Sequence, residues 1–295
     1  MPGVAAMSAD QFQPRRSLIF VPGDKPEMFS KALKTGADIV TIDLEDAVAP
    51  LHKTVARERT LPYFGTPDGH NAAGDSVERI VRINCLRSIE GIRDVNAIIG
   101  CPLPPKALML TKVRTADEVK LLDDLLTEAS LGIRFHVIIE TNDGLENCFA
   151  IAGASARIDS LLFGGVDLSA DLRTTYGWDN LVYARAKVVH AAAAAGVDLI
   201  DTPWLDLNDM DGMRKEAEKS AALGFSGKGA IHPKQIPALN EIFGPQPGQV
   251  ERARRIIKAF AESDSGLVVI DGKLIEKPVL RSMQRLIAIA DRMKP

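Results

Sequence analysis

Cysteine and histidine are scarce in this sequence, and their spacing argues against two common kinds of site. The cysteines are Cys85, Cys101 and Cys148, an odd number in which no pair has the spacing of a metal-binding or redox motif. The 5 histidines are scattered, and no HExxH motif or other dense cluster predicts a zinc site. Unpaired cysteines are typical of a reducing compartment, so we expect a cytoplasmic protein.

The sequence also lacks a strong charge excess and a long apolar run. The formal net charge is −3, and stretches such as AAAAAGV are far too short to cross a bilayer. We therefore expect neither a nucleic-acid nor a membrane partner. Residues 1–14 have no basic region or long apolar core of a signal peptide, and we expect them to form a flexible tail. The remaining composition, 46% hydrophobic and 25% charged, is typical of a globular protein with a large core.

Short runs rich in apolar and β-branched residues recur through residues 17–231. Most are apolar at successive positions, which is typical of parallel strands that are covered on both faces. The runs are SLIFV (17–21), DIVTIDL (38–44), RIVRIN (79–84), ALMLTKV (107–113), FHVIIE (135–140), SLLFGG (160–165), VDLID (197–201) and SGKGAI (226–231). The last run gives the weakest signal, because glycine interrupts it twice.

Helical patterns lie between these runs. In TADEVKLLDDLLTEA, for example, Thr115 and Glu118 form a capping box at the start of a helix. About eight alternations of strand and helix predict an α/β fold, a (β/α)8 TIM barrel that spans residues 15–244. A doubly wound open sheet has the same alternation, but the GxGxxG motif expected after its first strand is absent.

The pattern changes after residue 244. A basic amphipathic helix runs to about Ser263, GLVVIDGKLIEKP predicts a hairpin around Asp271 and Gly272, and a final helix follows. Residues 245–295 are too few to form their own core. We therefore expect this helix–hairpin–helix segment to pack on the barrel or on a neighbouring subunit, as a lid or an oligomerisation element.

Polar side chains gather at the ends of the predicted strands, where barrel enzymes place their chemistry. Glu140 and Asp167 follow adjacent strands, and two converging carboxylates repel unless a cation lies between them. Mg²⁺ prefers such oxygen ligands, so we favour a metal site over the alternative that each acid caps a helix. Lys112 is expected to be an ion-pair partner and Asp43 a structural residue. The other strand-end residues are Glu45, Asp46, Arg82, Asn84, Asp201 and His232.

Arg82 is suited to bind a substrate carboxylate, because its planar guanidinium can donate two parallel hydrogen bonds. An ion pair with Glu45 or Asp46 is an equal alternative, and we place both acids at the same substrate site. Gly164 and Gly165 leave backbone N–H groups open to an anion. They could equally form a tight turn, which also requires glycine.

Longer motifs resemble those of one family. The motifs are RRSLIFVPGDKPEM, GADIVTIDLEDAVAP, VRINCL, LTKVRTADEV, VIIETNDGL, LLFGGVDLSADL, YARAKVVHAAAAAGVDLIDTPW, GFSGKGAIHPKQI and VVIDGKLIEKP. They come in the order seen in the HpcH/HpaI aldolase/citrate lyase β-subunit superfamily. The chain resembles its CitE-like branch of malyl-CoA, citramalyl-CoA and citryl-CoA lyases, over about residues 15–292.

The resemblance implies a barrel enzyme that uses Mg²⁺, with Mn²⁺ as a substitute, to make or break a carbon–carbon bond between a 2-oxoacid and an acyl-CoA. It assigns Glu140 and Asp167 to the metal and Arg82 to the substrate carboxylate. It assigns Gly164 and Gly165 to the loop that binds the oxoacid. The residues that it assigns to the CoA thioester are Phe20, Lys25, Lys31, Ile231 and His232.

The resemblance also implies a homotrimer or hexamer, in which the C-terminal segment brings an acid to the active site of a neighbouring subunit. In KLIEKP this acid is Glu276, which we expect to be catalytic together with Arg82 and to move a proton at the thioester α-carbon. The chain departs from the family where LIE replaces MID, RINC replaces RVNP and ETNDG replaces ETARG. These departures leave the substrate open.

Two alternatives remain on the sequence alone. One is a CoA-independent class II pyruvate aldolase built on the same barrel. The other is a citrate lyase β-like subunit that acts on an acyl-carrier thioester, or that binds thioesters with little activity of its own.

Overall fold

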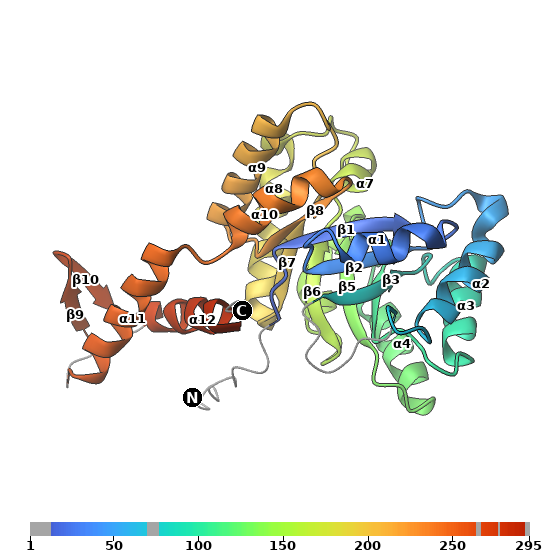
Figure 1. Cartoon of the computed structure of the whole chain (residues 1–295), viewed down its shortest axis with the longest axis horizontal. Coiled ribbons are helices and arrows are strands. Elements are labelled where there is room, and N and C mark those ends of the chain that lie inside the picture. The colour runs from blue at the N-terminus through green and yellow to red at the C-terminus, as the bar shows by residue number, and fades with distance from the viewer. Residues whose placement is uncertain (1–12, 70–76, 264–266, 277, 293–295) are drawn as a thin grey trace. The chain divides into compact units, whose positions relative to one another are not determined.

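The computed structural model describes residues 13–69, 77–263, 267–276 and 278–292. Strands β1 to β8 are parallel and close into a barrel in sequence order, with β8 paired to β1 (Figure 1). The strands are β1 (Ser17–Pro22), β2 (Ile39–Asp43), β3 (Glu78–Arg82), β4 (Ala107–Leu110), β5 (Arg134–Ile139), β6 (Ile158–Phe163), β7 (Asp198–Asp201) and β8 (Gly227–Ala230). This confirms the predicted (β/α)8 barrel, because a doubly wound sheet would be open.

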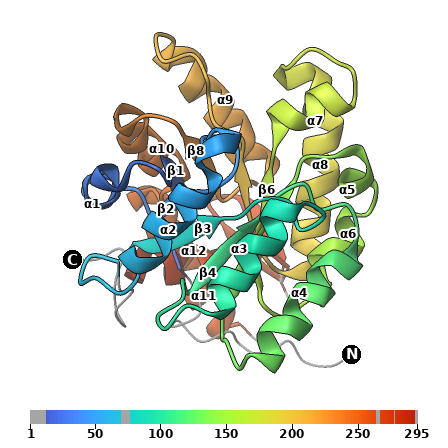
Figure 2. The ribbon, with the colours of Figure 1, turned by 90° about the vertical axis from the view of Figure 1, so that its right-hand side faces the viewer.

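Helices surround the barrel (Figure 2). The α-helices are α1 (Phe29–Leu33), α2 (Lys53–Tyr63), α3 (Ile89–Ile99), α4 (Ala116–Glu128), α5 (Asn142–Glu146), α6 (Cys148–Ala152), α7 (Gly165–Asp171), α8 (Trp178–Ala195), α9 (Met210–Leu223) and α10 (Ile236–Phe243). Short 3₁₀ turns are η2 (Pro26–Met28), η3 (Pro50–His52) and η4 (Pro233–Gln235). The predicted capping box of Thr115 and Glu118 begins α4. Across the described residues, no helix combines the length and the apolar character that a membrane crossing requires.

The interior of the barrel has an apolar middle. Strand side chains point to opposite faces in turn, so residues two apart share a face. The apolar cluster consists of Leu18, Ile39, Ile80, Ala107, Met109, Ile138, Leu162 and Ile200. Polar residues lie two positions before several cluster members, namely Glu78, His136, Ser160 and Asp198. Other polar residues lie two positions after cluster members, namely Thr41, Arg82, Glu140 and Thr202. Polar layers therefore lie on both sides of an apolar one, and the second polar layer is at the carboxyl ends of the strands.

The described residues outside Arg15–Ile242, those within Met1–Pro14 and Phe243–Pro295, belong to a second compact unit. Its helices α11 (Pro247–Ala261) and α12 (Pro278–Arg292) pack together, and between them lies the hairpin of β9 (Leu267–Ile270) and β10 (Lys273–Glu276). Asp271 and Gly272 form the two-residue turn with φ of 51° and 72°, the left-handed pair that such hairpins prefer. The predicted order of helix, hairpin and helix is therefore present. Residues 1–12 of the predicted tail lie outside the described residues.

Candidate active site

Arg82 ends β3 and is anchored on the adjacent strand β2. Its Nε and Nη2 donate to Asp43 Oδ1 and Oδ2 at 2.7 and 2.5 Å, and its guanidinium lies 4.8 Å from the centre of the Phe20 ring. Glu45, a predicted partner, is 3.6 Å from Nη1. The main partner is thus Asp43 rather than Glu45 or Asp46, because the strand register places Asp43 directly beside Arg82. This bidentate pair fixes one edge of the guanidinium, and Nη1 lies on the other.

The loop after β2 is tied to the same cluster. Asp43 accepts hydrogen bonds from the backbone N–H groups of Glu45 (2.8 Å) and Ala47 (2.9 Å), which agrees with its predicted structural role. Lys112 Nζ donates to Glu45 Oε1 and lies 3.4 Å from Asp46 Oδ1, so the predicted ion-pair partner is found. Burial raises the pKa of Glu45, against the opposing effect of the Arg82 charge. The loop is therefore held by charges from β3 and β4.

Glu140 follows β5 and is 3% exposed. Its Oε1 accepts a hydrogen bond from the backbone N–H of Lys112 at 2.7 Å. Burial, and next the negative charge of Asp167, raise the pKa of Glu140 to about 8. A nearby cation would relieve both effects, because it stabilises the ionised carboxylate.

Asp167 lies in the first turn of α7, which begins directly after β6. Its negative charge is near enough to Glu140 to raise the pKa of that carboxyl group. Within the described part of the chain, the Asp167 carboxylate makes no hydrogen bond or ion pair, and it is half-buried. The pair therefore offers hard oxygen ligands, the donor type that Mg²⁺ prefers, so the residues present fit this ion.

Gly164 is required where Glu140 crosses the chain. A Cβ at this position would stand 2.4 Å from Glu140 Cβ and 2.8 Å from Glu140 Oε2, closer than atoms can approach. The Gly164 N–H donates to the Ile139 carbonyl at 3.0 Å, as part of the barrel wall. The prediction that the Gly164 N–H is open to a substrate is therefore wrong. The corresponding prediction for Gly165, at the start of α7, stands as a prediction.

We expect Gly164→Ala to displace the Glu140 carboxylate and to weaken divalent-cation binding about tenfold or more. The measurement is calorimetric titration of metal-free protein with Mg²⁺. Gly153→Ala is the matched control, because the nearest atom to its Cβ is 3.8 Å away. Equal affinities of the two variants would show that the Glu140 side chain does not depend on a bare backbone at Gly164.

The residues predicted to bind CoA fall into two groups. Phe20 lies at the mouth of the barrel beside Arg82, whereas Lys25 and Lys31 are exposed on the segment that follows β1. Ile231 and His232 are exposed after β8, where His232 caps η4 by accepting from the Lys234 N–H at 3.1 Å. Because β1 pairs with β8, the two surface segments leave the barrel from adjacent strands.

Asp201, one of the strand-end acids, does not belong to this site. It accepts from Lys228 Nζ at 2.8 Å, Arg185 Nε at 3.1 Å and Ser220 Oγ at 2.6 Å, and the ion-paired side chains are fully buried. These partners come from the barrel strand β8 and from the surrounding helices α8 and α9, so the cluster lies between the barrel wall and those helices. The expectation that polar strand-end residues gather at the mouth fails for Asp201, because the residue follows inward-facing Ile200 and so points toward the helices.

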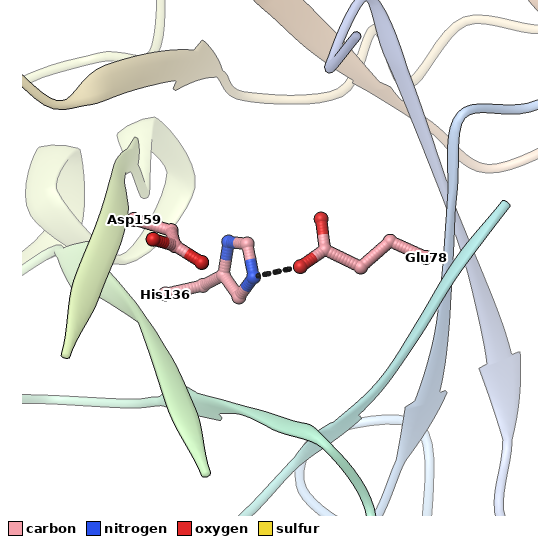
Figure 3. A group of neighbouring side chains, drawn as sticks. All are labelled: Glu78, His136 and Asp159. Carbon is pink, nitrogen blue, oxygen red and sulfur yellow. Dashed lines mark hydrogen bonds and ion pairs between the residues drawn. The ribbon is translucent and has the colours of Figure 1, made fainter. Parts of the chain in front are cut away.

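A second cluster was not predicted and lies at the opposite, amino-terminal end of the strands. Glu78, His136 and Asp159 come from β3, β5 and β6, with potential ligand atoms within 4.8 Å of one another (Figure 3). The His136 ring is 3.0 Å from Glu78, and Arg15 contacts Glu78 at 3.1 Å and Asp159 at 3.3 Å. The guanidinium of Arg15 thus supplies the cation, and we interpret the cluster as structural.

Glu276 is exposed in β10, opposite Leu267 of β9. It belongs to the C-terminal unit rather than to the barrel unit that holds Arg82 and Glu140. Its catalytic role therefore stays a prediction.

Comparison with known proteins places this site in context. The model of the HpcH/HpaI aldolase/citrate lyase family matches residues 16–233. The mitochondrial citramalyl-CoA lyase of Rattus norvegicus is 30% identical over 99% of this chain and 91% of its own length. The citrate lyase subunit beta of Leuconostoc mesenteroides is 32% identical over 94% of this chain and 93% of its own length. A solved structure of Mycobacterium tuberculosis CitE superposes on this chain with a TM-score of 0.75 and 29% sequence identity. The match covers 95% of this chain and 98% of CitE, which was solved in complex with magnesium, acetoacetate and coenzyme A.

Proposed function

The chain belongs to the HpcH/HpaI aldolase/citrate lyase family and is a carbon–carbon lyase of the CitE-like type, and from this premise we propose its reaction. The reaction is the cleavage, or the formation, of a β-hydroxyacyl-CoA such as citramalyl-CoA or malyl-CoA. The other products or substrates are a 2-oxoacid and an acyl-CoA. The observation that carries the proposal is the buried Glu140 carboxylate, held close to the open carboxylate of Asp167 at the barrel mouth.

Glu140 and Asp167 would hold Mg²⁺. When bound, this ion supplies positive charge that stabilises the substrate oxygen on which negative charge develops. The chain contributes the geometry. The Lys112 N–H fixes one oxygen of Glu140, and the bare backbone of Gly164 leaves room for the other. This choice of metal is supported by the structure of M. tuberculosis CitE, which was solved in complex with magnesium.

Arg82 would bind the carboxylate of the oxoacid. Its Nε edge is taken by Asp43 and its face by Phe20, so the guanidinium is held in one orientation. Such pre-orientation lowers the entropic cost of placing the substrate. The Gly165 N–H and the Glu45 and Asp46 loop would complete the substrate site.

The CoA thioester would lie across the mouth from the side of β1 and β8. Lys25 and Lys31 follow β1, Ile231 and His232 follow β8, and the two strands are neighbours. Exposed lysines suit the phosphates of CoA, and an exposed isoleucine suits an apolar part of the ligand. The resemblance of the PGDKPEMFSK segment to the CitE-like branch favours CoA over the alternative of a CoA-independent pyruvate aldolase.

We propose that the chain assembles as a homotrimer or hexamer and that its C-terminal unit acts on the active site of a neighbouring copy. Glu276 would then move a proton to or from the thioester α-carbon. We expect Glu276→Gln to keep the fold and the cation affinity but to lose turnover by about a hundredfold or more. Exposed Glu262 of the same unit supplies the control, Glu262→Gln, which should keep full turnover. Wild-type turnover in Glu276→Gln would reject the role.

The proposed function is tested with purified, metal-free protein. It is assayed with and without Mg²⁺, and with chelator, against citramalyl-CoA, malyl-CoA and citryl-CoA. We expect metal-dependent release of a 2-oxoacid and an acyl-CoA from at least one of them. The same preparations are also assayed on an acyl-carrier thioester and on free hydroxy-oxoacids. Activity only on the acyl-carrier thioester would favour the citrate lyase β-like alternative, and activity on free hydroxy-oxoacids without any effect of CoA would favour the aldolase. Equal activity in chelator would overturn the metal-dependent mechanism.

A further inference from the structure

Lys112 has an unusual backbone conformation for its position. Its φ is 53°, in the left-handed region that residues with a Cβ rarely adopt. The other described residues of this kind besides glycine are Ser130 and Arg173, after helices, and Asp271, in the hairpin turn. Lys112 instead lies just after a barrel strand, β4, at the candidate active site. A strained residue at such a place is a reason to look for a function.

The left-handed conformation aims the Lys112 N–H at a ligand of the proposed metal. This N–H donates to Glu140 Oε1 at 2.7 Å. Glu140 is almost fully buried, and across the described residues this N–H is the hydrogen-bond donor to its carboxylate. The orientation of the carboxylate therefore depends on the direction of one peptide N–H.

The side chain of Lys112 points to the other side of the mouth. Its ammonium group donates to Glu45 Oε1, and it lies 3.4 Å from Asp46 Oδ1. Glu45 in turn accepts from the Asp46 N–H at 2.9 Å. The single residue Lys112 thus connects the loop after β2 with Glu140, the acid after β5.

The residues on both sides of Lys112 are fixed. Thr111 Oγ1 donates to the Ile83 carbonyl at 3.0 Å, which ties the chain to β3. The Val113 carbonyl packs against Gly144, where a Cβ would come within 2.4 Å of it. Between these fixed points, the backbone angles of Lys112 decide where its N–H points.

We propose that Lys112 is a positioning residue for Glu140. The ion pair of its ammonium group with Glu45 holds the left-handed backbone, and that backbone directs the N–H that orients the carboxylate for a divalent cation. The inference rests on the proposed function, in which Glu140 is a metal ligand. It assigns the effect to the N–H, with the ammonium group acting only through the backbone.

Three substitutions separate the backbone from the charge. All of Lys112→Gly, Lys112→Asn and Lys112→Ala remove the ammonium group. Glycine and asparagine adopt positive φ readily, whereas alanine does not. We expect the Gly and Asn variants to bind Mn²⁺ within about threefold of the wild type, and the Ala variant about 10- to 100-fold more weakly. This order reverses the usual effect of glycine, which destabilises a chain more than alanine does.

The measurement is a titration of metal-free protein with Mn²⁺, followed by electron paramagnetic resonance without substrate. Circular dichroism checks that each variant is folded, and if Lys112→Ala is not, the comparison of the Asn variant with the wild type still tests the claim. Equal weakening in all three variants would show that the ammonium group itself acts and would overturn the proposal. No weakening in Lys112→Ala would show that Thr111 and Val113 alone set the backbone, and it would overturn the proposal as well. Mn²⁺ binding is also compared between the wild type and Glu140→Gln. If the wild type does not bind Mn²⁺, or if Glu140→Gln binds it equally well, the proposed function fails and this inference fails with it.

Discussion

Replacement of Glu140 by glutamine should abolish metal-dependent turnover while it stabilises the metal-free protein. Glutamine keeps an oxygen for the Lys112 N–H, but it removes the negative charge that a divalent cation requires. We expect cation binding to become undetectable in calorimetry. Turnover should fall about a thousandfold or more, because loss of the metal removes several kcal/mol of charge stabilisation.

The stability of the metal-free protein should change in the opposite direction. The folded-state pKa of Glu140 is raised to about 8 by burial and by Asp167, whereas the unfolded chain releases this proton near pH 4.3. Between these values the unfolded state binds fewer protons, so wild-type stability falls as the pH rises and levels off above about 8. At pH 8 the variant should therefore be more stable by about 2–4 kcal/mol, with little difference at pH 4.

Thermal unfolding with and without Mg²⁺, at both pH values, measures these effects. The wild type should gain stability from Mg²⁺ at pH 8, and Glu140→Gln should not. Exposed Glu146, on α5, gives the control Glu146→Gln, whose response to Mg²⁺ should match the wild type. A Glu140→Gln protein that is less stable than the wild type at pH 8 would mean that the carboxylate is not under electrostatic stress.

The barrel could be predicted because its strands are buried on both faces. Runs such as FHVIIE are apolar at successive positions, and they alternate with capped amphipathic helices, which together favour parallel strands. The hairpin could be predicted because Asp-Gly is a strong signal for a two-residue turn. Both signals are local, so one sequence is enough to read them.

The direction of each side chain was harder to predict. Ile200 belongs to the apolar layer inside the barrel, so its neighbour Asp201 must face the helices, although it stands at a strand end. The same alternation could have found Glu78 and His136, which stand two residues before the inward-facing Ile80 and Ile138. A rule based only on strand ends misplaced Asp201, and it missed Glu78 and His136.

Two features of the site could not be read from the sequence at all. Lysine rarely adopts a positive φ, so nothing in TKV predicts the backbone turn at Lys112. The pairing of Arg82 with Asp43 rather than Glu45 depends on strand register, which brings together residues that are distant in the chain. Both follow from tertiary contacts, which a single sequence does not reveal.

Replacement of Arg15 by methionine should strongly destabilise the barrel from its amino-terminal end. The Arg15 guanidinium contacts Glu78 at 3.1 Å, Asp159 at 3.3 Å and Asp198 at 3.0 Å, and its side chain is 9% exposed. Methionine keeps much of the volume but removes the cation from among three carboxylates. We expect the free energy of unfolding to fall by about 3–5 kcal/mol at pH 7, the usual cost of breaking a buried ion pair by removing one partner.

The pH dependence of this loss follows from Glu78. Burial would raise its pKa, but the charges of His136 and Arg15 prevail and hold the pKa well below its ordinary value. A lowered pKa contributes stability above the unfolded value of about 4.3, and this contribution disappears as the pH falls through the folded value. The difference between wild type and Arg15→Met should therefore be full at pH 7 and shrink steadily below about pH 4.

Urea unfolding at a series of pH values measures both the size and the pH dependence of the effect. Arg134→Met is the matched control, because Arg134 contacts the same Asp159 but its side chain is 44% exposed. An exposed ion pair contributes at most about 1 kcal/mol, so this variant should unfold close to the wild type. Equal losses in the two variants, or a loss in Arg15→Met that persists at low pH, would mean that lost packing rather than charge explains the effect. Cation binding at Glu140 should survive in folded Arg15→Met, because the apolar middle of the barrel separates the two polar layers.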